Sequence, residues 1–136
     1  MRIVGLDYGR ARIGIAKTDA LRIIVEPFCT LKREGALEHA IQALLKILAP
    51  YKPIELFVVG LPLLLNGQEG DMAKEARAFG GQLQLLSGIP VVYWDERLTS
   101  AQAEKALKPY MKRKQRAQHE DALAASYILE NYLQSI

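Results

Sequence analysis

Three carboxylic acids fall where an α/β fold could bring them together. Asp7 lies at the end of an apolar segment typical of a first strand, Glu96 follows the last such segment, and Asp121 lies in the first turn of the closing amphipathic segment. Open α/β sheets bind ligands beyond the carboxyl ends of their strands. The three acids are therefore candidate site residues, although each alone is also compatible with a turn residue or a first-turn acid on a helix dipole.

Clustering three acids has an electrostatic cost. Two carboxylates about 4 Å apart repel each other by about 4 kcal/mol at an effective dielectric constant of about 20. A fold that gathers three of them needs a cation, and an all-oxygen ligand set favours Mg²⁺ or Mn²⁺. The chain has two histidines and one cysteine, Cys29, and no Cys/His cluster of the kind that zinc prefers. These residues predict a site for Mg²⁺ or Mn²⁺.

The segment after Asp7 alternates small and branched side chains. Gly14 and Ala16 would share one face of a strand, and Ile13 and Ile15 would share the other. If the small face lies beside Asp7, it either leaves room for a bulky ligand or marks a bulge or close helix packing. The sequence leaves both alternatives open.

Basic residues concentrate in one short segment. The chain has a formal net charge of +3 and a pI near 9.0. The cations of this segment include Lys112, Arg113, Lys114 and Arg116. Such a patch permits nucleic-acid or phosphate binding, but a solvated loop has the same composition.

Hydrophobic periodicity predicts the elements that would position these residues. Short connections between the first three strands are typical of antiparallel hairpins, and Pro27 should confine the third strand to an edge or a bulge. The two later strands are apolar on both faces, as buried parallel strands are. Strands are expected at residues 2–8, 11–18, 22–31, 54–61 and 89–94. Helices are expected at residues 34–51, 71–86, 98–108 and 119–133.

This order of elements predicts one α/β domain over residues 1–136. Its sheet would be mixed and five-stranded, three antiparallel strands followed by two parallel ones, with helices on both faces. No segment reaches the roughly 18–20 apolar residues that cross a bilayer, and the first residues do not have the pattern of a signal peptide. A single cysteine in an apolar setting is typical of a reducing compartment. We therefore expect a cytoplasmic protein with no membrane partner.

Four segments together resemble the YqgF family, also called RuvX-like. They are "DYGRARIGIAKTD", "VVGLP…NGQEG", "VVYWDERLTSAQAE" and "EDALAASYILENYL", and they follow the family's order from the first residue to the last. The family comprises Holliday-junction-resolvase-like proteins with an RNase H-like fold, described as pre-16S rRNA nucleases. The resemblance implies that Asp7, Glu96 and Asp121 are catalytic acids that bind Mg²⁺ or Mn²⁺.

Other positions match the family's motifs in supporting roles. The resemblance implies that Arg12, Arg97 and the basic segment hold backbone phosphates, a contribution that depends on salt and not on sequence. The glycines and proline that match structural positions are Gly9, Gly14, Gly60, Pro62 and Gly67.

The chain also departs from the family's pattern. Leu64 and Asn66 stand where the family commonly has Asn and Asp, which leaves open any substrate contact by this loop. Arg10 and Ala11 replace a more usual Thr-Lys pair. Relatives of the fold often use a fourth acid, for which the candidates are Asp95, His119 and Glu120.

The resemblance implies metal-dependent hydrolysis of phosphodiester bonds at the 5′ end of pre-16S rRNA, in ribosome biogenesis, by a monomer or a homodimer. A resolvase acting on branched DNA and a non-catalytic RNA-binding assembly factor on the same fold are the alternatives, because a fold does not fix its chemistry. A phosphotransferase is a weaker alternative. Its D-x-G hairpin is similar, but such enzymes close two domains over a nucleotide.

Overall fold

A five-stranded mixed sheet forms the centre of the molecule. The computed structural model describes residues 1–97 and 120–136. Its strands pair antiparallel from β3 through β2 to β1 and parallel from β1 through β4 to β5. They are β1 (Arg2–Tyr8), β2 (Arg12–Thr18), β3 (Val25–Lys32), β4 (Ile54–Leu61) and β5 (Val91–Asp95). The predicted sheet, three antiparallel strands followed by two parallel ones, is confirmed.

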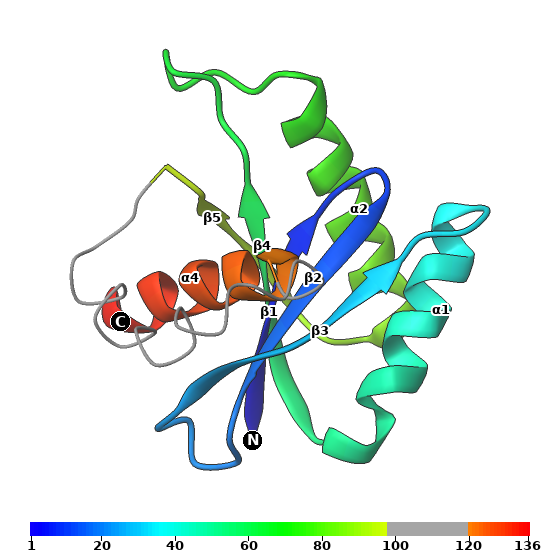
Figure 1. Cartoon of the computed structure of the whole chain (residues 1–136), viewed down its shortest axis with the longest axis vertical. Coiled ribbons are helices and arrows are strands. Elements are labelled where there is room, and N and C mark those ends of the chain that lie inside the picture. The colour runs from blue at the N-terminus through cyan, green and yellow to red at the C-terminus, as the bar shows by residue number, and fades with distance from the viewer. Residues whose placement is uncertain (98–119) are drawn as a thin grey trace.

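Helices cover both faces of the sheet (Figure 1). On one face lie α1 (Leu37–Leu48), which continues into the 3-10 turn η1 (Ala49–Tyr51), and α2 (Asp71–Ser87). The helix α4 (Glu120–Gln134) crosses the opposite face and packs on β1, β2 and β3. The predicted helices on both faces are thus confirmed for the described part of the chain.

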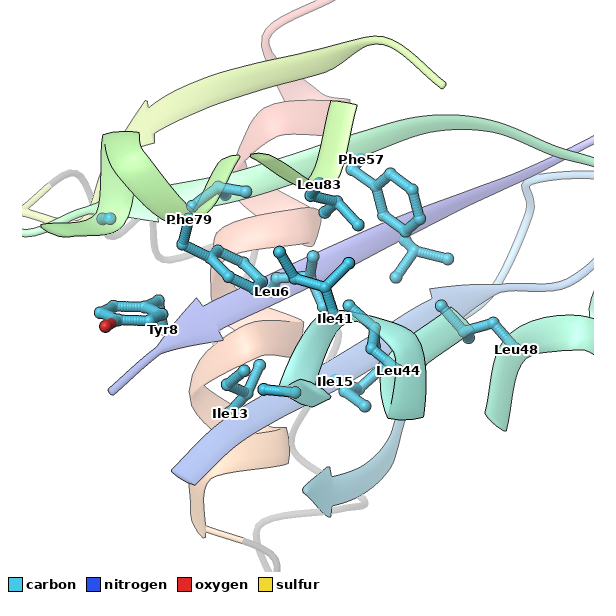
Figure 2. Packing of buried hydrophobic residues seen from close by; sticks show 14 of the residues in the cluster. Leu6, Tyr8, Ile13, Ile15, Ile41, Leu44, Leu48, Phe57, Phe79 and Leu83 are labelled. Carbon is cyan, nitrogen blue, oxygen red and sulfur yellow. The ribbon is translucent and has the colours of Figure 1, made fainter. Parts of the chain in front are cut away.

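Strand alternation decides which side chains each helix covers. The side chains that point toward α1 and α2 are large and branched, and Figure 2 shows them packed against the apolar stripes of both helices. These strand residues include Leu6, Tyr8, Ile13 and Ile15. The side chains that point toward α4 include smaller ones, such as Ala16, beside Ile3 and Val58. Small residues on this face let α4 approach the sheet closely.

Several predicted boundaries differ from the structure, and the largest differences are at β3 and α1. The third strand begins at Val25 rather than at residue 22, because Asp19 Oδ1 accepts hydrogen bonds from the backbone N–H groups of Ile23 (2.7 Å) and Ile24 (3.1 Å) and closes a turn. Its edge position and a register shift opposite Pro27 confirm the expectation for that proline. The first helix begins at Leu37 rather than at residue 34, and its α-helical part ends at Leu48.

The helix expected at residues 98–108 lies outside the described residues. In the part of the chain that the structure describes, no helix combines the length and the apolar character needed to cross a membrane.

Candidate active site

The carboxyl ends of β1 and β5 and the first turn of α4 bring the candidate acids to the α4 face of the sheet. Asp7 is directly opposite Gly14 in the antiparallel register of β1 and β2. Glu96 follows β5, two residues after Trp94, which pairs with Gly60 of β4. Because side chains alternate along a strand, Asp7 and Glu96 project to the same face. Asp121 reaches this end of the sheet from the first turn of α4.

Gly14 permits the close approach that brings Asp121 here. A Cβ at this position would overlap the backbone carbonyl of Asp121 and would lie 3.0 Å from the backbone nitrogen of Ala122. Any side chain on residue 14 would therefore push the start of α4 away from β2. Of the two alternatives for the small face of this strand, the structure supports close helix packing.

Gly60 makes comparable room for Glu96. A Cβ on Gly60 would lie 2.8 Å from both Cγ and Oε1 of Glu96, and it would overlap Ile128 of α4. The carboxylate of Glu96 thus occupies space left by a missing side chain on the neighbouring strand. Two of the family-matched glycines, Gly14 and Gly60, each accommodate one of the three acids.

A hydrogen bond joins the side chains of Asp7 and Glu96. Two ionised carboxylates have no donor, so one of the two must carry a proton. Burial, followed by this hydrogen bond and the charge of Asp7, raises the pKa of Glu96 to about 8. Burial also raises the pKa of Asp7, the hydrogen bond opposes this rise, and the charge of Asp121 adds to it. Glu96 is therefore the protonated partner near neutral pH.

Asp121 lies beside this pair rather than within it. Its charge acts on Asp7, but its own Oδ2 lies 3.4 Å from Nε of Arg12. Such an exposed ion pair contributes about 1 kcal/mol at most. Among residues 1–97 and 120–136, no three His, Cys, Asp or Glu side chains are arranged so that they could hold a metal ion. The structure brings Asp7 and Glu96 together and leaves Asp121 next to them on Arg12.

The donor set is chemically suited to a hard divalent cation. Asp7 and Glu96 provide carboxylate oxygens, which Mg²⁺ and Mn²⁺ prefer. Because the pair is partly buried, two negative charges there are unfavourable. The proton on Glu96 removes one of these charges, as a bound cation would compensate it. A cation at this position would replace that proton, and Asp121 would join the ligands only by leaving Arg12.

Arg97 has partners within the protein. Its guanidinium contacts both carboxylate oxygens of Asp95, with Nη2 2.8 Å from Oδ2, and this ion pair lowers the pKa of Asp95. Its Nη1 also donates to the backbone carbonyls of Leu64 (3.4 Å) and Leu65 (3.3 Å). Arg97 therefore connects the segment between β4 and α2 to Asp95, the last residue of β5. The phosphate-binding role implied for Arg97 stays a prediction.

The segment between β4 and α2 that Arg97 contacts is a turn that extends beyond the end of β4 (Figure 1). Pro62 follows the strand directly, and Gly67 has a φ of +86°, a left-handed conformation that favours glycine. The backbone N–H of Gly67 donates to the carbonyl of Leu64 (2.8 Å), and a Leu63–Glu69 bridge closes the base of the turn. These contacts give the matched residue Gly67 a structural role, and the role implied for Pro62 stays a prediction.

Some predicted site residues fall outside what the structure describes. The basic segment with Lys112, Arg113, Lys114 and Arg116 lies outside, as does His119, one candidate for a fourth acid site. Of the other two candidates, Asp95 is engaged by Arg97, and the backbone of Glu120 begins α4.

A polar network that the sequence did not indicate lies at the same end of the sheet, on its other face. Tyr8 accepts a hydrogen bond from Nη1 of Arg33 (2.6 Å) and donates one to Glu75 (3.4 Å). Arg10, which departs from the family's pattern, forms an ion pair with Glu75. Strand alternation, which assigns Tyr8 to the face opposite Asp7, is the signal that could have located this network.

Comparison with protein families gives one match over nearly the whole chain. The model of the RuvX family, described as "Holliday junction resolvase", matches residues 1–135. A protein of Protochlamydia amoebophila named "Putative pre-16S rRNA nuclease" is 40% identical over 98% of this chain and 93% of its own length. A protein of the same name from Endomicrobium trichonymphae is 42% identical, with 97% and 94% covered.

Two solved structures have the same fold at low sequence identity. The RuvC structure of Thermus thermophilus superposes with a TM-score of 0.60 at 14% identity and covers 99% of this chain and 96% of that one. The Holliday junction resolvase of fowlpox virus gives a TM-score of 0.60 at 11% identity and covers 99% of both chains. The predicted RNase H-like fold is thus confirmed.

Proposed function

Because the chain belongs to the RuvX family, we propose that it is a single-domain endonuclease that uses Mg²⁺ or Mn²⁺ to hydrolyse phosphodiester bonds near the 5′ end of pre-16S rRNA. The observation that carries this proposal is the hydrogen-bonded pair of Asp7 and Glu96 at the carboxyl ends of β1 and β5. Partly buried carboxylates with raised pKa values are typical of functional sites, and a divalent cation in place of the shared proton would let both groups ionise. A divalent ion bound there would polarise a phosphate oxygen and lower the pKa of water for in-line attack.

The residues around the site would have three roles: binding the cation, binding a phosphate and positioning the neighbouring turn. Asp7 and Glu96 provide the ligands that are already in contact, and Asp121 is the third acid, poised beside them in the first turn of α4. Arg12 would hold a backbone phosphate of the substrate once Asp121 turns to the cation. Arg97 keeps the turn after β4 in place beside the site.

The names of the curated relatives favour RNA as the substrate. The proteins of Protochlamydia amoebophila and Endomicrobium trichonymphae are both named as pre-16S rRNA nucleases and match almost end to end. The Thermus thermophilus RuvC has been solved in complex with a Holliday junction substrate, and the fowlpox virus protein is named a Holliday junction resolvase, so branched DNA is the second candidate substrate. A non-catalytic RNA-binding factor would keep the fold without the reaction.

Cleavage assays with matched variants test the proposal. Wild-type protein should cleave an RNA that contains the 5′ leader of 16S rRNA in Mg²⁺ or Mn²⁺, and should not cleave it in EDTA. Asp7→Asn should lose this activity by at least a hundredfold, whereas Asp71→Asn, at an exposed aspartate of α2, should retain it. A four-way DNA junction in a parallel reaction identifies the alternative substrate. Equal cleavage by wild type and Asp7→Asn would refute the catalytic role of Asp7.

A further inference from the structure

Lys32 lies next to Arg12 on the face of the sheet that carries Asp7. The two residues are directly opposite each other in the antiparallel register of β2 and β3. Side chains of such cross-strand neighbours project to the same face, with Cβ atoms about 5 Å apart. Arg12 reaches Asp121 of α4, so both cations belong to the α4 face of the sheet.

The position of Leu31 supports the conclusion that Lys32 projects to the α4 face. Leu31, the neighbour of Lys32, packs against the cluster under α1 and α2, opposite α4. Its cross-strand partner Ile13 belongs to the same cluster. Because successive side chains alternate, Lys32 projects to the face of Asp7.

Lys32 also carries a charge that the fold leaves uncompensated. Its side chain is exposed, and among the ion pairs of residues 1–97 and 120–136 none includes it. Arg10 is neutralised by Glu75 and Arg12 by Asp121, whereas the nearest acid in sequence, Glu34, lies beyond the end of β3 and forms no ion pair in the same described residues. A free lysine at this position contributes little to folding and is available to an anion.

The spacing between two cross-strand pairs relates Lys32 to the candidate site. Asp7 pairs with Gly14, and Arg12, which pairs with Lys32, lies two residues before Gly14 at the start of β2. Two residues of a strand span about 6.6 Å, and β3 lies two strand spacings, about 9.6 Å, from β1. The long side chain of Lys32 can cover part of this distance. A backbone that places one phosphate at Asp7 and Glu96 would bring an adjacent phosphate to the row of Arg12 and Lys32.

We propose that Lys32 and Arg12 form a phosphate-binding pair for the nucleotide adjacent to the scissile phosphate of a nucleic-acid strand. This inference rests on the proposed function, since it takes the strand to pass over Asp7. The contact is to the backbone, so it adds affinity without sequence preference.

The test is the salt dependence of RNA binding without cleavage. A short fluorescein-labelled single-stranded RNA is titrated with the full chain in EDTA, and the logarithm of the association constant is followed against that of the salt concentration. Lys32→Ala should reduce the magnitude of the slope by about 0.7–1, the loss of one phosphate contact. Lys32→Arg should restore the wild-type slope. Lys52→Ala, an equal charge change at an exposed lysine at the opposite end of the sheet, should leave the slope unchanged.

The outcomes separate this inference from the proposed function. Equal slopes for wild type and Lys32→Ala, or equal reductions by Lys32→Ala and Lys52→Ala, would overturn the phosphate contact even if the protein cleaves RNA. A reduced slope for Lys32→Ala alone, in a protein that cleaves neither RNA nor junction DNA, would support the contact and refute the nuclease.

Discussion

Replacing Gly14 with alanine tests whether close packing of α4 positions Asp121. The new Cβ would lie less than 2.5 Å from the carbonyl carbon and oxygen of Asp121 and 3.0 Å from the nitrogen of Ala122, whereas ordinary contact begins at 3.4 Å. All three atoms belong to backbone, so no side-chain rotation can relieve the overlap. The start of α4 must retreat from the sheet by more than about 1 Å to restore ordinary contact.

That retreat has a calculable cost. A gap of 0.5–1 Å forfeits about a quarter to a half of the dispersion energy of each affected contact. Overpacking of a closely packed interface usually costs about 1–3 kcal/mol, and a rigid backbone neighbour places this case near the upper end. We therefore expect Gly14→Ala to lower the free energy of unfolding by about 2–3 kcal/mol in urea denaturation.

The matched control is Gly81→Ala in α2. A Cβ at Gly81 would meet no atom within 4 Å, so alanine should stabilise the helix by about 0.5–1 kcal/mol. Under conditions where both variants are folded, only Gly14→Ala should lose cleavage activity, because only it displaces Asp121. A Gly14→Ala protein with wild-type stability and activity would refute the claim that close packing of α4 is required.

Two further predictions concern the acid pair and the turn beside it. In EDTA, the protonated Glu96 should stabilise the protein fully below pH about 4.5, and this contribution should be lost as the pH rises to about 8, because the pKa of Glu96 is raised in the folded state. Glu96→Gln should therefore have a flatter dependence of unfolding free energy on pH than wild type in urea titrations; parallel curves would contradict the shared proton. Arg97→Ala should speed hydrogen exchange of the Gly67 amide at least tenfold, because the turn loses its anchor, whereas Arg22→Ala at the other end of the sheet should leave it unchanged. Unaltered exchange in Arg97→Ala would show that the turn is held by its own hydrogen bonds.

The fold was predictable because its signals are local. Continuous apolar runs identified β4 and β5 as parallel strands, and Pro27 identified β3 as an edge strand. The expectation that β5 is buried was wrong, because β5 is the other edge strand and its five residues are only half-buried. The start of β3 was wrong because its boundary depends on the hydrogen bonds of Asp19 to two backbone N–H groups. Alternation alone does not reveal such a turn.

The candidate site was predictable in its members but not in their arrangement. Strand ends and the resemblance indicated Asp7, Glu96 and Asp121. The sequence could not show which two of the acids share a proton, because this depends on their burial and on the distances between them. Both depend on the space that Gly60 leaves for the side chain of Glu96. The ion pair of Arg12 with Asp121 depends on how the two side chains are oriented in the fold, and no sequence pattern predicts this.

Calorimetric titration with Mn²⁺ tests the central claim, that Asp7, Glu96 and Asp121 bind a divalent ion together. Wild-type protein should bind Mn²⁺, and Asp7→Asn, Glu96→Gln and Asp121→Asn should each weaken binding at least tenfold, whereas Asp71→Asn should bind as wild type does. Absence of Mn²⁺ binding by the wild type, or wild-type affinity in Asp121→Asn, would contradict the three-acid site.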